Sequence, residues 1–290
     1  LALATTAGGR RLGRADLPVA EDLAARIAVA VDNARSHRAR VHLAQTLQRS
    51  LLPPALPCIE GIRLAARYHP VRGGGEVGGD FYDVFPLGDG RWGAVIGDVC
   101  GSGALAASLT ALVRYTVRAE ARRGDPPSLV LQNLHRAVLE QDLGERFCTV
   151  ALAYLQPRAA AVEVTVSCAG HPLPLLSGPE GPIRPVGRPG SAIGLVERAE
   201  FSDTSELVIG GQVLAFYTDG VIEARDSEGR LDDRLLEAAL ARSAGQGLEA
   251  VAQAIEGDVL AHYGGVPRDD VAFLLVSPEV SPEHRGRPSG

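Results

Sequence analysis

Residues 92–98 read Trp-Gly-Ala-Val-Ile-Gly-Asp, a short apolar run that ends in a carboxylate. Residues 213–219, Val-Leu-Ala-Phe-Tyr-Thr-Asp, have the same pattern. Apolar runs of this length, bounded by turn residues, are typical of buried strands. Asp98 and Asp219 are therefore expected where buried strands end. Two further aspartate sites lie beside glycine or a strand, namely Gly79-Asp80, and Asp269-Asp270 directly ahead of the apolar run at 271–276.

Strands that each present a carboxylate at one edge can bring their oxygens to one point. Carboxylates so close raise one another's pKa, and they cannot all stay ionised without a cation. All-oxygen ligation favours Mg²⁺ or Mn²⁺ over zinc. An aspartate beside a glycine is also ordinary turn chemistry, so any one of these sites taken alone favours a turn. Four together favour a carboxylate metal site suited to phosphate-ester chemistry.

The composition excludes several enzyme classes. The chain has no lysine, so its 29 Lys+Arg residues are all arginines. P-loop enzymes, protein kinases and Schiff-base enzymes each need a lysine. Residues 53–278 hold 19 arginines and 29 acidic residues, a net charge of −10. This disfavours nucleic-acid binding, which needs clustered cations. No apolar run approaches the ~20 residues that span a bilayer.

The four cysteines are far apart and form no Cys-x-x-Cys pair. This spacing is typical of reduced thiols and predicts a cytoplasmic location. Methionine is absent as well. We therefore expect the chain to be a piece of a longer reading frame.

Strand and helix patterns come in runs and do not alternate, which favours an α+β fold with antiparallel sheets. Residues 177–200 are rich in Gly and Pro and are expected to form a loop. Strands are expected at 62–68, 92–97, 147–155, 162–167, 173–176, 213–218 and 271–276. Helices are expected at 104–122, 128–139, 231–243 and 248–262.

A long helix is expected ahead of this body. Asp16 is suited to cap its start. The pattern from Leu23 to Leu51 is helical, and Pro53-Pro54 would end it. Helices of over thirty residues are typical of coiled coils and connectors between domains, so a homodimer through this helix is expected. Two shorter helices packed on the body are the alternative.

The aspartate motifs resemble the signatures of a known family. The resemblance is to the SpoIIE-type branch of the protein phosphatase 2C (PPM) family, in the family's order across residues 61–277. It is carried by Val77–Phe85, Gly97–Gly103, Ala169–Pro172, Tyr217–Ala224 and Asp269–Val271. It implies a metal-dependent serine/threonine phosphatase with a four-layer α-β-β-α sandwich behind a long N-terminal helix.

The resemblance also implies a ligand set for two Mn²⁺ or Mg²⁺ ions. Asp80 and Asp98 are the implied catalytic residues, with Asp98 bridging both ions. Asp270 matches a neighbouring position in the family, and Asp83 is given a structural role. The implied metal ligands are Asp80, Asp98, the carbonyl of Val99, Asp219 and Asp269.

The chain departs from the family at Cys100, which stands where eukaryotic relatives have a general-acid histidine. Protonation of the leaving group would then fall to water. Ser102 and Ala272 also differ from the usual residues, but neither change removes a ligand. His171 is expected to be a packed, hydrogen-bonded histidine. Arg72 is a candidate phosphate contact, or else a solvated loop residue.

The start of the chain resembles two other segments. Residues 16–35 are similar to the last helix of GAF sensor domains, and residues 45–53 to the helical linker ahead of SpoIIE-type catalytic domains. The expected organisation is a GAF-like remnant at 1–37, a helical linker at 38–57, the phosphatase domain at 58–277 and a disordered tail at 278–290.

The resemblance implies a phosphorylated anti-sigma-factor antagonist of the STAS type as substrate, in bacterial sigma-factor signalling. It further implies in-line attack on phosphorus by a metal-bridging water. A non-catalytic, phosphatase-like interaction module is the first alternative, and the four intact aspartates argue against it. A two-metal hydrolase or cyclase acting on nucleotides is the second, but the acidic, lysine-free body offers no evident triphosphate cradle.

Overall fold

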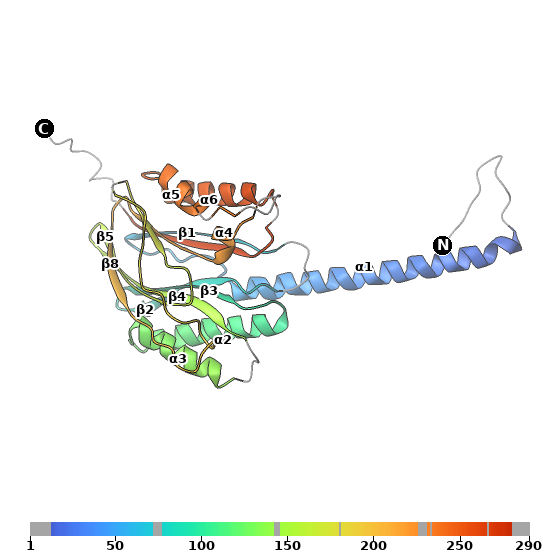
Figure 1. Ribbon diagram of the computed structural model, residues 1–290, viewed down its shortest axis with the longest axis horizontal. Helices are drawn as coiled ribbons and strands as arrows, with labels where there is room; N and C mark the ends of the chain where they lie inside the picture. The colour runs from blue at the N-terminus through green and yellow to red at the C-terminus, as the bar shows by residue number, and fades with distance from the viewer. Residues whose placement is uncertain are drawn as a thin grey trace.

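Two antiparallel sheets form the centre of the computed structural model (Figure 1). The structure describes residues 13–71, 77–141, 146–179, 181–225, 231–232, 234–265 and 267–279. The first sheet has the order β1 (Ile62–His69), β10 (Val271–Pro278), β9 (Val213–Tyr217), β6 (Leu175–Ser177) and β7 (Arg184–Pro185). The second has the order β2 (Phe81–Gly88), β3 (Arg91–Val99), β4 (Cys148–Arg158), β5 (Ala161–Ala169) and β8 (Thr204–Ile209).

Helices cover the outer face of each sheet. α5 (Leu235–Arg242) and α6 (Leu248–His262) lie on the first sheet, while α2 (Ala104–Ala121) and α3 (Pro127–Leu139) lie on the second (Figure 1). A third apolar core fills the space between the sheets. The order of layers is therefore helix, sheet, sheet, helix, and the predicted α-β-β-α sandwich is confirmed.

Strand alternation decides which side chains face the space between the sheets. In β3, Ala94 and Ile96 belong to the core between the sheets, whereas Val95 and Val99 pack toward α2 and α3. Successive side chains of a strand point to opposite faces. Asp98 therefore shares the inner face with Ala94 and Ile96, at the end of the strand.

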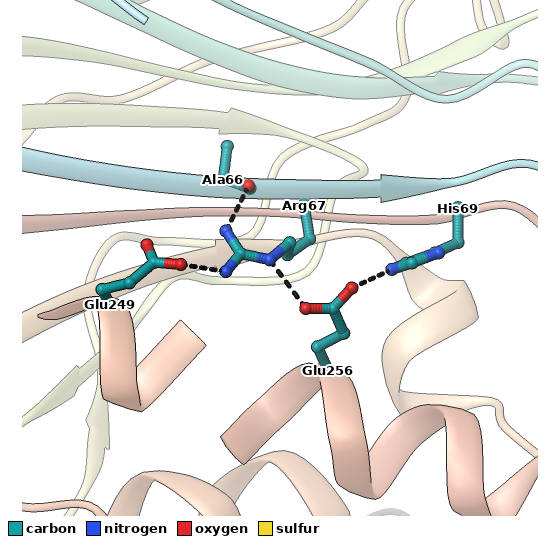
Figure 2. Close-up of polar contacts among 5 residues, drawn as sticks. All are labelled: Ala66, Arg67, His69, Glu249 and Glu256. Carbon is teal, nitrogen blue, oxygen red and sulfur yellow. Dashed lines mark hydrogen bonds and ion pairs between the residues drawn. The ribbon is translucent and has the colours of Figure 1, made fainter. Parts of the chain in front are cut away.

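Ion pairs fasten α6 to the edge strand β1. Arg67 donates from Nε to Glu256 at 2.7 Å and from Nη2 to Glu249. His69 Nε2 lies 2.7 Å from the second carboxylate oxygen of Glu256 (Figure 2). Glu256 thus joins two side chains of the strand, and this fixes the helix along β1.

A second charged cluster is buried beside β2. Asp83 is 1% exposed and accepts hydrogen bonds from Arg114 Nε at 2.8 Å and Arg118 Nη1 at 2.9 Å. Arg114 also donates from Nη1 to the carbonyl of Leu51 at 3.2 Å. Asp83 therefore binds two arginines of α2, and one of them, Arg114, also contacts the end of the N-terminal helix. These contacts are those of a structural residue.

The N-terminal helix α1 (Leu17–Leu51) is one continuous helix of 35 residues, so the alternative of two shorter helices is wrong. Its last turns pack on the body, where Ala44 and Leu51 are buried against Ala107 and Val77. The rest projects away from the sandwich (Figure 1). None of the described helices is both long and apolar enough to cross a membrane.

Some expected boundaries need correction. The expected loop 177–200 contains the short strand β7. The sequence interpretation also missed β2 and β8; in β8, polar and apolar residues do not alternate in the sequence. The helix expected at 231–243 begins only at Leu235, since Leu231 forms a bridge with Arg225. Pro278 still belongs to β10, and Glu279 N donates to the carbonyl of Gly61 at 2.9 Å. Residues 280–290 of the expected tail, and residues 1–12 of the expected sensor remnant, lie outside the described residues.

Candidate metal centre

Three predicted ligands meet at one end of the sandwich. Asp80 directly precedes β2, Asp98 lies in β3, and Asp219 begins the short helix α4 (Asp219–Ile222) after β9. One carboxylate oxygen from each lies within 4.8 Å of the others. Side chains up to 139 positions apart in the chain therefore form one cluster of oxygen atoms.

Three glycines make this close approach possible. A Cβ on Gly79 would lie 2.2 Å from the carbonyl oxygen of Val99 and 2.4 Å from Asp98 Oδ1. A Cβ on Gly78 would meet Asp270 Oδ2 at 1.4 Å, and one on Gly220 would meet the carbonyl oxygen of Asp270 at 1.9 Å. Only glycine allows such contacts, so these glycines are required for packing at the site.

The carbonyl of Val99 lies beside the carboxylate of Asp98. The same Cβ position on Gly79 is close to both oxygens, and Val99 N donates to the carbonyl of Gly79 at 3.2 Å. This hydrogen bond holds the backbone of the two segments together. The carbonyl oxygen of Val99 and the carboxylate of Asp98 therefore lie near the same point, and the role of Val99 as a ligand stays a prediction.

Thr218 holds Asp80 in place. Its hydroxyl donates to Asp80 Oδ2 at 2.7 Å and accepts a hydrogen bond from Ala272 N at 3.0 Å. Thr218 and Asp80 are both buried. The carbonyl of Ala272 is the second acceptor within reach of this hydroxyl, at 3.3 Å, so the nearer carboxylate of Asp80 is the preferred one.

Burial and like charge perturb the acids of the cluster. Burial, followed by the charges of Asp219 and Asp269, raises the pKa of Asp98 to about 7, although a hydrogen bond with Asp80 partly offsets the rise. Burial and the charge of Asp98 raise the pKa of Asp80 well above its ordinary value. Burial and Asp269 raise the pKa of Asp219. A divalent cation would remove this repulsion, and all-oxygen donors suit Mg²⁺ or Mn²⁺.

Asp269 and Asp270 differ in their environments. Asp270 is buried, and its carboxylate accepts hydrogen bonds from Val71 N at 2.9 Å and the hydroxyl of Tyr68 at 3.1 Å. Asp269 is exposed and accepts a hydrogen bond from Asp270 N at 2.8 Å. Asp269 lies outside the three-carboxylate cluster. Protein donors already satisfy Asp270, so Asp269 stays the predicted ligand of the pair.

Sequence reasoning missed Thr218, Tyr68 and Tyr263 around this site. Thr218 was within a quoted motif, directly ahead of Asp219, and that adjacency was the available signal. Tyr263 donates to the carbonyl of Gly220 at 2.9 Å from α6. Neither tyrosine has a local pattern that would mark it.

His171 has the packed environment expected for it. Its Nδ1 lies 2.8 Å from Thr149 Oγ1, and burial lowers the pKa of the ring to about 3. Cys100 is half-buried in the loop after Val99. Arg72, the candidate phosphate contact, lies outside the described residues.

Known proteins share this sequence pattern. The family described as Stage II sporulation protein E (SpoIIE) matches residues 88–279. Protein IcfG of Synechocystis is 26% identical over 270 residues, which cover 83% of this chain and 42% of IcfG. Phosphoserine phosphatase RsbU of Bacillus subtilis is 24% identical over 196 residues, covering 67% of this chain and 57% of RsbU. The chain thus spans about half the length of these curated relatives.

Solved structures share the fold. The SiaA-PP2C domain of Pseudomonas aeruginosa has a TM-score of 0.69 at 20% identity, covering 85% of this chain and 98% of that domain. The RsbU and RsbW domains of a Mycobacterium tuberculosis protein have a TM-score of 0.65 at 26% identity, covering 77% of this chain and 62% of that one. The fold is therefore of the PP2C type. Because the family match includes β3 to β10 and with them Asp98, Asp219 and Asp269, the chain belongs to the SpoIIE family.

Proposed function

We propose that this chain is a Mn²⁺- or Mg²⁺-dependent phosphatase acting on phosphoserine or phosphothreonine in a protein. The observation that carries the proposal is the convergence of Asp80, Asp98 and Asp219 within 4.8 Å. The raised pKa values of all three support it, because burial and the charges of neighbouring carboxylates raise them, and a bound cation would offset both effects. The names of two relatives, phosphoserine phosphatases RsbU and RsbP, support the reaction.

Each residue has a defined task in this proposal. Asp80, Asp98, Asp219, Asp269 and the carbonyl of Val99 would hold two ions. The bound ions would supply an activated water and neutralise the phosphoryl oxygens during in-line displacement. Thr218 keeps Asp80 oriented through its 2.7 Å hydrogen bond.

The substrate we propose is a phosphorylated anti-sigma-factor antagonist of the STAS type, in sigma-factor signalling in the cytoplasm. The similarity to RsbU and RsbP supports this context. The organisation we propose has a sensor remnant at 1–37, a linker at 38–57 and the catalytic domain from 58. Because α1 runs unbroken through residue 37, sensor and linker would share one helix.

The deciding experiment compares hydrolysis of an aryl phosphate and a phosphoserine peptide with Mn²⁺ and with a chelator. We expect turnover only with metal, and a loss of at least a hundredfold in Asp98→Asn, since each ligand supports the charge of the reacting group. Asp22→Asn, on the exposed part of α1, is the matched control and should behave as the unmodified chain. Turnover that survives chelation would refute the metal mechanism.

The non-catalytic alternative makes a different prediction. A binding module would show no turnover on either substrate at any metal concentration. Mn²⁺ titration by calorimetry separates an inert chain that still binds metal from one that has lost the site.

A further inference from the structure

Arg146 contacts the loop that directly follows Asp98 and Val99, and it is not one of the predicted metal ligands. Asp98 in β3 pairs with Thr149 in β4, and Cys100 N donates to the carbonyl of Phe147 at 3.0 Å. The pairing of the two segments thus continues past the ends of the strands. This brings Arg146 to the loop that directly follows Asp98.

The guanidinium of Arg146 is held against this loop. Nη1 donates to the carbonyl of Cys100 at 3.0 Å. Gly101 has a φ of +91°, and a Cβ added there would lie 2.7 Å from the same nitrogen. The loop therefore carries its glycine where the arginine side chain passes, and a larger residue would displace the guanidinium.

The backbone of Arg146 is fixed from the other side as well. Cys148 and Ile193 exchange two backbone hydrogen bonds, of 3.0 and 2.8 Å. A Cβ on Gly194 would lie 3.4 Å from the carbonyl oxygen of Arg146. The residue is thus held between the β3–α2 loop and the segment around Ile193, which restricts where its side chain can go.

Arg146 also differs from the other sheltered arginines in its charge environment. Among the described residues, five arginines are buried or half-buried, and three of them, Arg67, Arg114 and Arg118, pair with carboxylates. Arg146 forms no ion pair with a described carboxylate; its described partner is a carbonyl. Arg91, the fifth, lies at the opposite end of β3. Arg146 is therefore a half-buried cation whose described partner is the neutral carbonyl of Cys100, the residue that directly follows the predicted ligand Val99.

We propose that Arg146 binds the phosphoryl group of the substrate, donating charge-assisted hydrogen bonds to its non-bridging oxygens. The inference rests on the proposed phosphatase function and names a residue that contacts the substrate. A guanidinium presents donors in a planar fork that matches phosphate geometry. In a chain without lysine, a cationic side chain at this position of the substrate has to be an arginine or a protonated histidine.

The test uses the full chain and two variants, Arg146→Gln and Arg146→Lys. Gln keeps a hydrogen-bond donor but has no charge, whereas Lys keeps the charge without the fork. The binding of inorganic phosphate to the Mg²⁺-loaded chain is measured by calorimetry, and KM and kcat are measured for an aryl phosphate. Mg²⁺ affinity is measured separately without phosphate. Arg91→Gln is the matched control.

We expect Arg146→Gln to weaken phosphate binding about ten- to a hundredfold, the size of a hydrogen bond to a charged group. KM should rise by a similar factor, Arg146→Lys should recover part of the loss, and Mg²⁺ affinity should not change. Unchanged phosphate binding in Arg146→Gln would overturn the proposal. So would a parallel loss of Mg²⁺ affinity, since that would give Arg146 a purely structural role.

These outcomes are independent of turnover. An unmodified chain that binds phosphate through Arg146 but hydrolyses neither substrate would support the phosphate contact and contradict the proposed phosphatase function. If the unmodified chain hydrolyses the substrates, and Arg146→Gln has the same KM and the same phosphate binding, the phosphatase function is supported and the phosphate contact of Arg146 is refuted.

Discussion

Gly79 has no side chain, and this lets its backbone come close to two predicted oxygen ligands of the metal centre. Its Cα approaches Asp98 and the carbonyl of Val99 so closely that any Cβ would overlap both. We expect Gly79→Ala to separate these two oxygens and to weaken Mn²⁺ binding at least tenfold. Overpacking of this kind costs about 1–3 kcal/mol in stability, so the variant should still fold.

Calorimetric Mn²⁺ titration and thermal unfolding check this prediction. Gly257→Ala is the matched control, because Gly257 lies in α6 and an added Cβ there meets nothing within 4 Å. That substitution should leave Mn²⁺ affinity unchanged and stabilise the helix by up to about 1 kcal/mol. Equal Mn²⁺ affinity in both variants would show that Gly79 is not needed for the site.

His171 makes the fold sensitive to acid. Burial lowers the pKa of its ring to about 3, against an ordinary value of 6.5. Between these values the unfolded chain binds a proton that the folded chain does not, so stability falls as the pH falls from 6.5 toward 3. The loss is up to about 1.4 kcal/mol for each pH unit. His171→Asn, which can keep the hydrogen bond to Thr149, should flatten this dependence.

Urea unfolding at pH 7 and pH 4.5 measures the effect. His42→Asn is the control, since His42 is exposed on α1. The control should lose as much stability on acidification as the unmodified chain does. A His171→Asn variant with the same loss would mean that another group causes the acid sensitivity.

At the scale of single residues, the sequence predicted the acidic residues of the site better than the residues that contact them or their loops. Asp80, Asp98 and Asp219 were found because each follows an apolar run or a glycine, and such local patterns are visible without a structure. Thr218 and Arg146 act across strands that are far apart in the chain. Contacts of that kind depend on strand pairing and register, which no local pattern specifies.

At the scale of the elements, ion pairs join α6 to β1, and Glu256 takes part in two of them. Glu256 contacts both Arg67 and His69, and its side chain is 27% exposed. Among the residues that the structure describes, Glu249 pairs with Arg67 alone, and its side chain is 63% exposed. We expect Glu256→Gln to destabilise the chain by about 1 kcal/mol, and Glu249→Gln by less than about 0.5 kcal/mol, because exposed ion pairs contribute little.

Chemical unfolding of both variants at low salt and at 1 M salt measures these differences. Screening should reduce the cost of Glu256→Gln only in part, since its partners are sheltered. Equal costs for the two variants would show that burial does not set the strength of this contact.

The elements themselves were predictable where their pattern was strong. The helix at 248–262 was predicted with the boundaries that the structure has, and β3 and β10 were found from their apolar runs. β8 was missed, because the apolar residues Leu207 and Ile209 lie on the exposed side of this edge strand, so its sequence shows no apolar and polar alternation. Edge strands bury one face at most, so their sequences carry less signal.

At the scale of the whole molecule, the α-β-β-α sandwich does not account for the length of α1. Its residues from 17 to 43 project from the body, with Leu23 43% and Ile27 40% exposed. These two share one face of the helix with Ala30 and Ala34, at spacings of three and four residues. Helices in proteins gain most of their stability from packing one face against a partner. We therefore predict that two chains associate through this face.

Substitutions two residues apart on α1 test this association. Ile27→Glu places a charge on the apolar face, whereas Val29→Glu makes a similar change on another face, where Val29 is 61% exposed. Light scattering at matched concentrations should give a dimer for the unmodified chain and for Val29→Glu, and a monomer for Ile27→Glu. Because the described apolar contacts between the sandwich and α1 involve its last turns, both variants should keep the same unfolding transition of the body. A monomer in all three cases would refute the dimer, and a dimer in all three would place the contact elsewhere on the molecule.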